Sequence, residues 1–318
     1  MSPDREARVP LPNFFIAGAP KAGTTSLYAY LGQHPRIYTS PIKEPMFFAA
    51  RDLLSEPERQ QFLRYVGRNP RELRIFLRDA EERRGARYIL HWDDYRRLFE
   101  GVEGETAIGE GSVDYFWLPS AARAIRERVP GARLVFLLRH PAEKVFVSYF
   151  VALRREPDLR FRDWFLAATE PGSPAWPIVD GARYATHLER FLGLFPREQI
   201  RIHLYDAYRA DVRAVIRDVF AFLDVDPDYP VDTSRRHNEG LMPRSAVLHR
   251  LRRALFGDHA PTAIFPQPVR DVVRRWYFRP RGDVAMDPGD RRLVLDYYRD
   301  EVVRTEQIIG QDLSAWRR

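Results

Sequence analysis

Residues 12–31 read PNFFIAGAPKAGTTSLYAYL, an apolar run that leads into a glycine-containing turn with one lysine and then into the start of a helix. The run 13–17 is apolar and aromatic enough for a buried strand, and the hydroxyl residues at 24–26 are typical of a helix start. Backbone N–H groups at such a start point into the turn, and the helix dipole favours an anion there. The stretch therefore predicts a strand, an anion-binding turn and a helix.

The turn differs from the loop that binds nucleotide triphosphates. That loop has a glycine, four residues, and then Gly-Lys-Ser/Thr. Gly18 and Gly23 have the spacing, but Thr24 stands at the lysine position and Lys21 lies inside the turn. This placement disfavours an ordinary ATPase or GTPase. The alternative is a plain turn whose glycines only relieve a steric constraint, but the donors of Lys21, Gly23, Thr24 and Thr25 favour an anion site.

The composition limits the class of protein. The 318 residues are 45% hydrophobic, enough for a large core in a single domain at 13–318, after a loose lead-in at 1–12. Because there is no membrane-spanning run and no apolar signal-peptide core, we expect a cytoplasmic protein. The chain has no cysteine, which excludes thiolate catalysis, thiolate metal sites and disulfides. The net charge of +7 predicts attraction to anions, which include nucleic acid, anionic lipid and small polyanions.

Short apolar runs alternate with helical patterns along the chain. Strands are predicted at 106–108, 133–138 and 199–204, and helices at 53–66, 71–84, 119–129, 142–156, 181–195, 211–223 and 290–316, the last with Gly310 followed by DLSAW near its end. Alternation of this kind predicts an α/β fold with a central, mainly parallel sheet flanked by helices. Residues 233–287 lack clean periodicity and are expected to form a lid or an acceptor-side insertion.

A second anion site is predicted after the strand at 133–138. Arg139 follows that strand directly, Pro141 suits a first helical turn, and Ser148 lies in the helix that follows. Ligands of open α/β sheets bind beyond the carboxyl ends of the strands. Lys21 and Arg139 would therefore suit one ligand with phosphate at two ends. The alternative for Arg139 is a surface ion pair at a strand end.

Two motifs resemble the signatures of a known family. GAPKAGTTSL at 18–27 and FLLRHPAEKVFVSY at 136–149 are similar to the two motifs of sulfotransferases that use 3′-phosphoadenosine 5′-phosphosulfate (PAPS). The resemblance covers most of the chain and is strongest to the branch with bacterial carbohydrate sulfotransferases and heparan sulfate N- and 3-O-sulfotransferases. Further similar segments are KEPMFF at 43–48, GEGSVDYF at 109–116, RYATHLERFLGLFP at 183–196 and IIGQDLSAW at 308–316.

The resemblance implies a P-loop-like sulfotransferase fold, PAPS as co-substrate and no metal. It implies that the 5′-phosphosulfate is held by Lys21, Ala22, Gly23, Thr24, Thr25 and Ser26. It assigns the 3′-phosphate to Arg139 and Ser148, and a place near the adenosine to Tyr184. A late cofactor-contacting loop would comprise Arg236, His237 and Asn238, with Arg235 and Arg244 nearby.

The chain departs from the family pattern at two positions. The family usually has serine eight residues after the strand-end arginine, whereas Ser148 is nine residues after Arg139 and Val147 takes the expected place. One residue turns a helical side chain by about 100°, so either a bulge absorbs the extra residue or Ser148 points elsewhere. Gly111 stands where the heparan-type branch often has lysine, which disfavours an acidic polysaccharide as acceptor.

Sulfuryl transfer needs a group that takes the proton of the acceptor. Glu44 resembles the glutamate with this role in the heparan branch, and Lys21 would stabilise the charge of the leaving phosphate. The alternative for Glu44 is a surface ion pair with Lys43. His91 is a minor alternative base, and His34 is expected to be structural or on the surface. No metal-ligand cluster is visible in the sequence.

Two other classes of protein stay open at this stage. One is a P-loop-like small-molecule kinase that uses ATP and Mg²⁺. The other is a basic nucleic-acid-binding protein, which draws on arginine-rich segments such as 246–253 but has no base-reading motif. For the sulfotransferase, the acceptor is expected to be a hydroxyl or amine of a carbohydrate, glycolipid or other small molecule, with no nucleic acid involved. Neither that acceptor nor the oligomeric state follows from the sequence.

Overall fold

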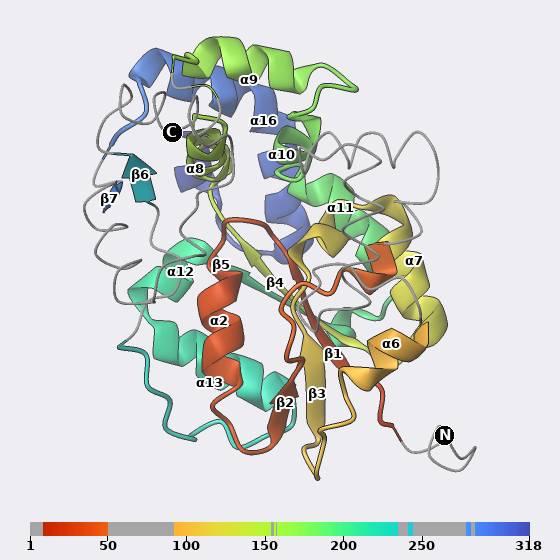
Figure 1. The fold of residues 1–318 in the computed structure, drawn as a ribbon. Helices are drawn as coiled ribbons and strands as arrows, with labels where there is room; N and C mark the ends of the chain where they lie inside the picture. The colour runs from red at the N-terminus through yellow and green to blue at the C-terminus, as the bar shows by residue number, and fades with distance from the viewer. Residues whose placement is uncertain are drawn as a thin grey trace.

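The structure is a computed structural model that describes residues 9–49, 92–153, 156, 158–234, 241–243, 278–280 and 284–318. Its centre is a parallel sheet of five strands in the order β2-β3-β1-β4-β5 (Figure 1). The strands are β1 (Phe14–Gly18), β2 (Ile37–Thr39), β3 (Ala107–Glu110), β4 (Arg133–Leu138) and β5 (Ile200–Leu204). Because all five run in one direction, their carboxyl ends lie together at one end of the sheet.

Helices cover both faces of this sheet (Figure 1). The α-helices in the described residues are α2 (Thr24–Leu31), α6 (Trp92–Arg97), α7 (Pro119–Arg128), α8 (Pro141–Ala152), α9 (Phe161–Thr169), α10 (Trp176–Asp180), α11 (Tyr184–Leu192), α12 (Tyr205–Ala210), α13 (Val212–Phe222) and α16 (Pro288–Ile309). Short 3₁₀ turns are η1 (Phe47–Ala49), η2 (Val113–Phe116), η3 (Arg197–Gln199) and η5 (Ser314–Arg317). A separate antiparallel pair joins β6 (Leu241–Pro243) and β7 (Phe278–Pro280).

The core has one layer on each side of the sheet. Along β1, Phe15 and Ala17 belong to one buried cluster, whereas Phe14 and Ile16 belong to the other. This is the alternation of a strand covered on both faces, which explains why the strands read as continuous apolar runs. Helices α2 and α13 pack on the face of Phe14, and α7, α8, α11 and α16 pack on the face of Phe15.

The predicted α/β class is confirmed, and the predicted strands match β1, β3, β4 and β5. Strand β2 was not predicted, since three residues carry little periodicity; α6, α9, α10 and α12 were not predicted either. The last helix ends at Ile309, because Gly310 takes a φ of 67° that stops it. Helix α8 ends at Ala152, short of the predicted 156.

Some predictions lie outside the described residues. They are the helices at 53–66 and 71–84, residues 1–8 of the lead-in and most of the predicted lid at 233–287. Within the part of the chain that is described, no helix combines the length and the apolar character needed to cross a membrane.

Candidate active site

The turn between β1 and α2 depends on glycine at its end. Gly23 caps the amino end of α2 with a φ of 90°, in the left-handed region that side chains disfavour. A Cβ at this position would lie 3.1 Å from the ring of Tyr208 and 3.2 Å from that of Tyr205. The backbone and the two neighbouring rings therefore both require glycine here.

Lys21 lies exposed within the same turn, with a left-handed φ of 66° that is uncommon for a residue with a side chain. Helix α2 begins at Thr24 without a side-chain cap, and the first N–H groups of a helix have no partner within it. Ala22 and Thr24 are buried, while 25 and 26 are half-buried in the first helical turn. The turn thus combines a lysine with the positive end of a helix, as the sequence predicts.

Arg139 connects the second predicted site to this turn. Its Nη1 donates a hydrogen bond of 3.2 Å to the carbonyl oxygen of Lys21, and its guanidinium lies 4.6 Å from the ring centre of Tyr205. The ion pair foreseen as its alternative role is present too, since Nη2 lies 3.7 Å from a carboxylate oxygen of Glu143. Its Nε is buried and has no hydrogen-bond partner among the described residues. Arg139 therefore lies against the turn that carries Lys21, at the carboxyl end of the sheet.

Tyr184 fixes the backbone at Arg139. Its hydroxyl donates to the carbonyl oxygen of Arg139 at 2.6 Å and accepts from the N–H of Arg139 at 3.4 Å. The side chain is fully buried, and this burial raises the pKa of the phenol above its ordinary value. Tyr184 therefore holds the residue that would meet a phosphate, through the main chain.

Ser148 is turned toward its own helix. Helix α8 is α-helical from Pro141 to Ala152 with no bulge, and the buried Ser148 hydroxyl donates to the carbonyl oxygen of Lys144 at 2.9 Å. The extra residue between Arg139 and Ser148 is thus not absorbed by the helix. Contact between Ser148 and a 3′-phosphate stays a prediction.

Glu44 lies beside the carboxyl end of β3. Its N–H donates to the carbonyl oxygen of Gly111 at 3.0 Å, and its Oε1 is 2.5 Å from Nζ of Lys43. The Glu44 side chain is 18% exposed, so it is reachable without being freely solvated. The ion pair with Lys43 that was foreseen as the alternative is therefore present, at the same end of the sheet as Lys21.

Glu110, the last residue of β3, was not singled out from the sequence. Its carboxylate is fully buried and accepts three hydrogen bonds, from the hydroxyls of Tyr95 (3.0 Å), Tyr115 (2.7 Å) and Ser112 (2.6 Å). Burial raises the pKa of Glu110 to about 7, against the lowering effect of these hydrogen bonds. An acidic residue at the end of a buried strand was a signal that could have marked Glu110 as a candidate.

Lys144 is a second ionisable group that the sequence did not reveal. It lies on α8, is almost fully buried, and donates to the carbonyl oxygen of Ile178 at 2.5 Å. Burial lowers the pKa of Lys144 to about 7, although Asp180 and Asp114 act in the opposite direction. Its place in the helical part of the predicted 3′-phosphate motif at 136–149 gave no hint of burial, because lysines in helices are mostly exposed.

Other predicted residues lie elsewhere. His34 is buried between the rings of Phe220 and Tyr229, and its Nδ1 accepts from the N–H of Arg36 at 3.0 Å, as a structural histidine does. The predicted residues outside the described part of the chain are His91, Arg235, Arg236, His237, Asn238 and Arg244. Among the described residues, no group of His, Asp and Glu side chains has the arrangement of a metal site.

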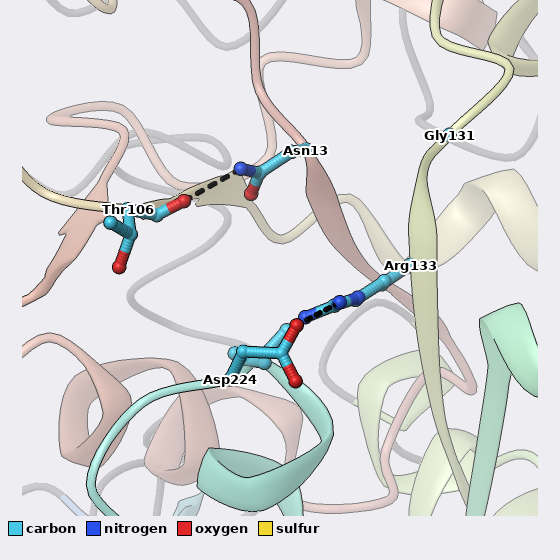
Figure 2. A pocket seen from close by; sticks show the side chains of 6 residues that line it. Asn13, Thr106, Gly131, Arg133 and Asp224 are labelled. Atoms are coloured by element: carbon cyan, nitrogen blue, oxygen red, sulfur yellow. Dashed lines mark hydrogen bonds and ion pairs between the residues drawn. The ribbon is translucent and has the colours of Figure 1, made fainter.

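A hollow of about 300 Å³ lies at the opposite, amino end of the strands (Figure 2). There Asn13 donates to the carbonyl oxygen of Thr106 at 2.7 Å, and Arg133 is paired with Asp224. Asn13 also accepts from the N–H of Ile108 at 2.9 Å, so it holds the starts of β1 and β3 together. The side chains of Asn13, Arg133 and Asp224 thus bond to their neighbours, and the hollow lies at the end of the strands opposite to Lys21 and Arg139.

Comparisons with known proteins show which proteins the chain resembles. The chain is 25% identical to the human bifunctional heparan sulfate N-deacetylase/N-sulfotransferase 3 over 325 residues. The aligned residues make up 97% of this chain and 31% of the human protein. It is 24% identical over 362 residues to human carbohydrate sulfotransferase 15, covering 96% of this chain and 55% of that protein. The chain thus spans about a third and about half of the length of these two relatives.

A solved structure covers the whole fold. The sulfotransferase from Alicyclobacillus acidocaldarius is 30% identical, with a TM-score of 0.67 over 97% of this chain and 100% of that one. The family model for the sulfotransferase family matches residues 12–229, which is more than half of the chain and includes both motifs at 18–27 and 136–149. The resemblance seen in the motifs is confirmed, and the chain belongs to the sulfotransferase family.

Proposed function

We propose that this sulfotransferase takes the sulfuryl group from PAPS and transfers it to a hydroxyl or amine of a carbohydrate or other small acceptor. The observation that carries the proposal is the hydrogen bond from Arg139 to the carbonyl oxygen of Lys21, which brings Arg139 against the backbone of the turn that carries Lys21 and leads into α2. PAPS carries anionic groups at both its 5′ and 3′ ends. The buried Nε of Arg139, which has no partner among the described residues, fits such a ligand.

The donor would be held by the residues predicted for it. Lys21 and the head of α2, residues 22–26, would bind the 5′-phosphosulfate, and Arg139 would bind the 3′-phosphate with its backbone fixed by Tyr184. Ser148 and the loop residues Arg236, His237 and Asn238 stay in the proposal as predicted contacts. When bound, PAPS supplies an activated sulfuryl group. Lys21 would stabilise the negative charge on the departing phosphate oxygen.

Glu44 is the proposed base. Its carboxylate would accept the proton from the acceptor oxygen or nitrogen as the bond to sulfur forms. Its hydrogen bond to Gly111 holds it at the end of the sheet where Lys21 and Arg139 lie. The human relatives named above support a carbohydrate acceptor, since both are named as sulfotransferases of carbohydrate. A cytoplasmic location remains part of this proposal.

Calorimetry tests the donor, and a mass-based screen tests the reaction. We expect 3′-phosphoadenosine 5′-phosphate (PAP) to bind and ATP with Mg²⁺ to bind far more weakly. Labelled PAPS offered with a panel of sugars, glycolipids and other small alcohols and amines should give a product heavier by one sulfuryl group. Binding of ATP with Mg²⁺ and not of PAP would instead show a kinase-like protein and end the proposal.

A further inference from the structure

The carboxylate of Glu110 is linked through two hydroxyls to the segment that carries Glu44. Oε1 accepts from the hydroxyl of Tyr115 at 2.7 Å, and that hydroxyl accepts from the N–H of Phe48 at 3.2 Å. Oε2 accepts from the hydroxyl of Ser112 at 2.6 Å, and that hydroxyl accepts from the N–H of Met46 at 3.2 Å. The last residue of β3 thus reaches two amides of residues 44–48, which we call the base segment.

The base segment has a backbone that needs such support. Glu44 and Met46 have left-handed φ angles of 64° and 59°, which side chains adopt only when their surroundings hold them there. The hydrogen bond from Glu44 N–H to the carbonyl oxygen of Gly111 adds a third link to the end of β3. Three hydrogen bonds therefore join the base segment to residues 111–115.

The direction of these hydrogen bonds requires an acceptor at position 110. Each hydroxyl receives an N–H from the base segment, so each must give its own proton to something else. The ionised carboxylate of Glu110 takes both protons, and it is fully buried, so water cannot substitute. A protonated acid or an amide at this position would bring protons of its own and break this order.

We propose that Glu110 is a positioning residue for sulfuryl transfer, which orients the hydroxyls of Ser112 and Tyr115 so that they hold the base segment and Glu44 in the reactive position. The inference rests on the proposed role of Glu44 as base. It adds to that role a reason why a carboxylate with no path to solvent lies at the end of β3.

Three single substitutions separate the two links from the rest of the cluster. Ser112→Ala removes the link to Met46, and Tyr115→Phe removes the link to Phe48. Tyr95→Phe is the matched control, because the hydroxyl of Tyr95 bonds to Glu110 at 3.0 Å without bridging it to the base segment. All three changes remove one buried hydroxyl that donates to the same carboxylate.

The readouts are kcat with an acceptor found in the screen, the Kd of PAP, and the Tm. We expect Ser112→Ala and Tyr115→Phe to lower kcat by about tenfold or more, because a small displacement of a catalytic group is enough for that. The Kd of PAP should stay within about twofold, since the donor residues are untouched. Tyr95→Phe should lose a similar amount of Tm and keep kcat within about twofold.

The pH profile gives a readout that a purely structural role would not move. The titratable groups that face Glu110 are Tyr28 on α2, Lys43 just before the base segment, Tyr95 on α6 and Tyr115 on η2. Burial raises the pKa of the three tyrosines, so they keep their protons near neutrality. We expect kcat of the unmodified chain to fall as the pH drops below about 7, and Glu110→Gln to have a low kcat without that step.

Two results would overturn the inference alone. One is a kcat that falls equally in all three variants or in proportion to Tm, and the other is a Kd of PAP that rises as kcat falls. Normal turnover in Glu44→Gln would show that Glu44 is not the base, and the inference about Glu110 would fail with it. The proposed donor site would not be affected by that result. A chain that neither binds PAP nor consumes PAPS would overturn both the proposed function and the inference.

Discussion

Lys21 is the side chain on which the proposed donor site should depend most, because it supplies a positive charge inside the turn. We expect Lys21→Ala to lower kcat by about a hundredfold or more and to weaken PAP by about tenfold. Lys21→Arg keeps the positive charge but changes the shape of the charged group, so its kcat and its Kd of PAP should lie between those of the unmodified chain and of Lys21→Ala. Steady-state kinetics and calorimetry measure these effects. Unchanged kinetics in Lys21→Ala would contradict the proposal that the turn binds the 5′-phosphosulfate.

Glu44 and Lys43 form an ion pair, so their roles need to be separated. Glu44→Gln should lower kcat by about a hundredfold or more while the Kd of PAP stays nearly unchanged, because only the proton acceptor is lost. Lys43→Gln breaks the same ion pair and keeps the carboxylate, so it should retain most of the turnover. Equal losses in the two variants, measured at saturating PAPS, would make Glu44 a structural partner of Lys43.

The raised pKa of Glu110 determines the direction in which the free energy of unfolding changes with pH. In the folded chain the pKa of Glu110 is about 7, above the ordinary 4.5. The stabilisation that comes from protonated Glu110 is therefore complete below pH 4.5 and is lost as the pH rises through 7. Relative to Glu110→Gln, the unmodified chain should therefore lose about 3 kcal/mol of unfolding free energy between pH 4.5 and pH 8. Urea unfolding at several pH values measures the difference, and a flat or rising difference would contradict it.

Helix α8 brings an acid to the phosphate end of the site. Glu143 in its first turn lies 3.7 Å from Arg139 and 3.1 Å from Arg291 of α16. Because this carboxylate competes with a bound phosphate for Arg139, Glu143→Gln should lower the Kd of PAP by about threefold at low salt, and less at high salt. Glu189→Gln on α11, which removes one of the two acidic partners of Arg304 among the described residues, the other being Glu301, is the control and should leave the Kd of PAP unchanged. Weaker PAP binding in Glu143→Gln would mean that the acid orients Arg139.

Among the elements, the strands that could be predicted are those with long apolar runs and cover on both faces. Strand β2 was missed because it has three residues, of which only Ile37 is buried. The position of Ser148 could be questioned from its spacing, but its bond to Lys144 depends on the geometry of α8. The burial of Glu110 was out of reach, because it depends on hydroxyls from α6 and η2 that meet only in the folded chain.

For the molecule as a whole, the order β2-β3-β1-β4-β5 explains why the site could be foreseen in outline. Strands β1, β3 and β4 are neighbours, so the residues after their carboxyl ends must meet whatever their distance in sequence. That rule was enough to place Lys21 with Arg139. It could not place the base segment, which follows β2 and is held by side chains from the end of β3.

The stacking of Arg139 on Tyr205 also gives the site an optical signature. A guanidinium 4.6 Å from a phenol ring polarises the electrons of that ring. If an anion bound at the proposed phosphate end draws the guanidinium of Arg139 toward itself, we expect the near-ultraviolet circular dichroism of Tyr205 to change with it. The difference between the spectra of the unmodified chain and of Tyr205→Leu, each with and without PAP, would then report occupancy of that end with no label attached.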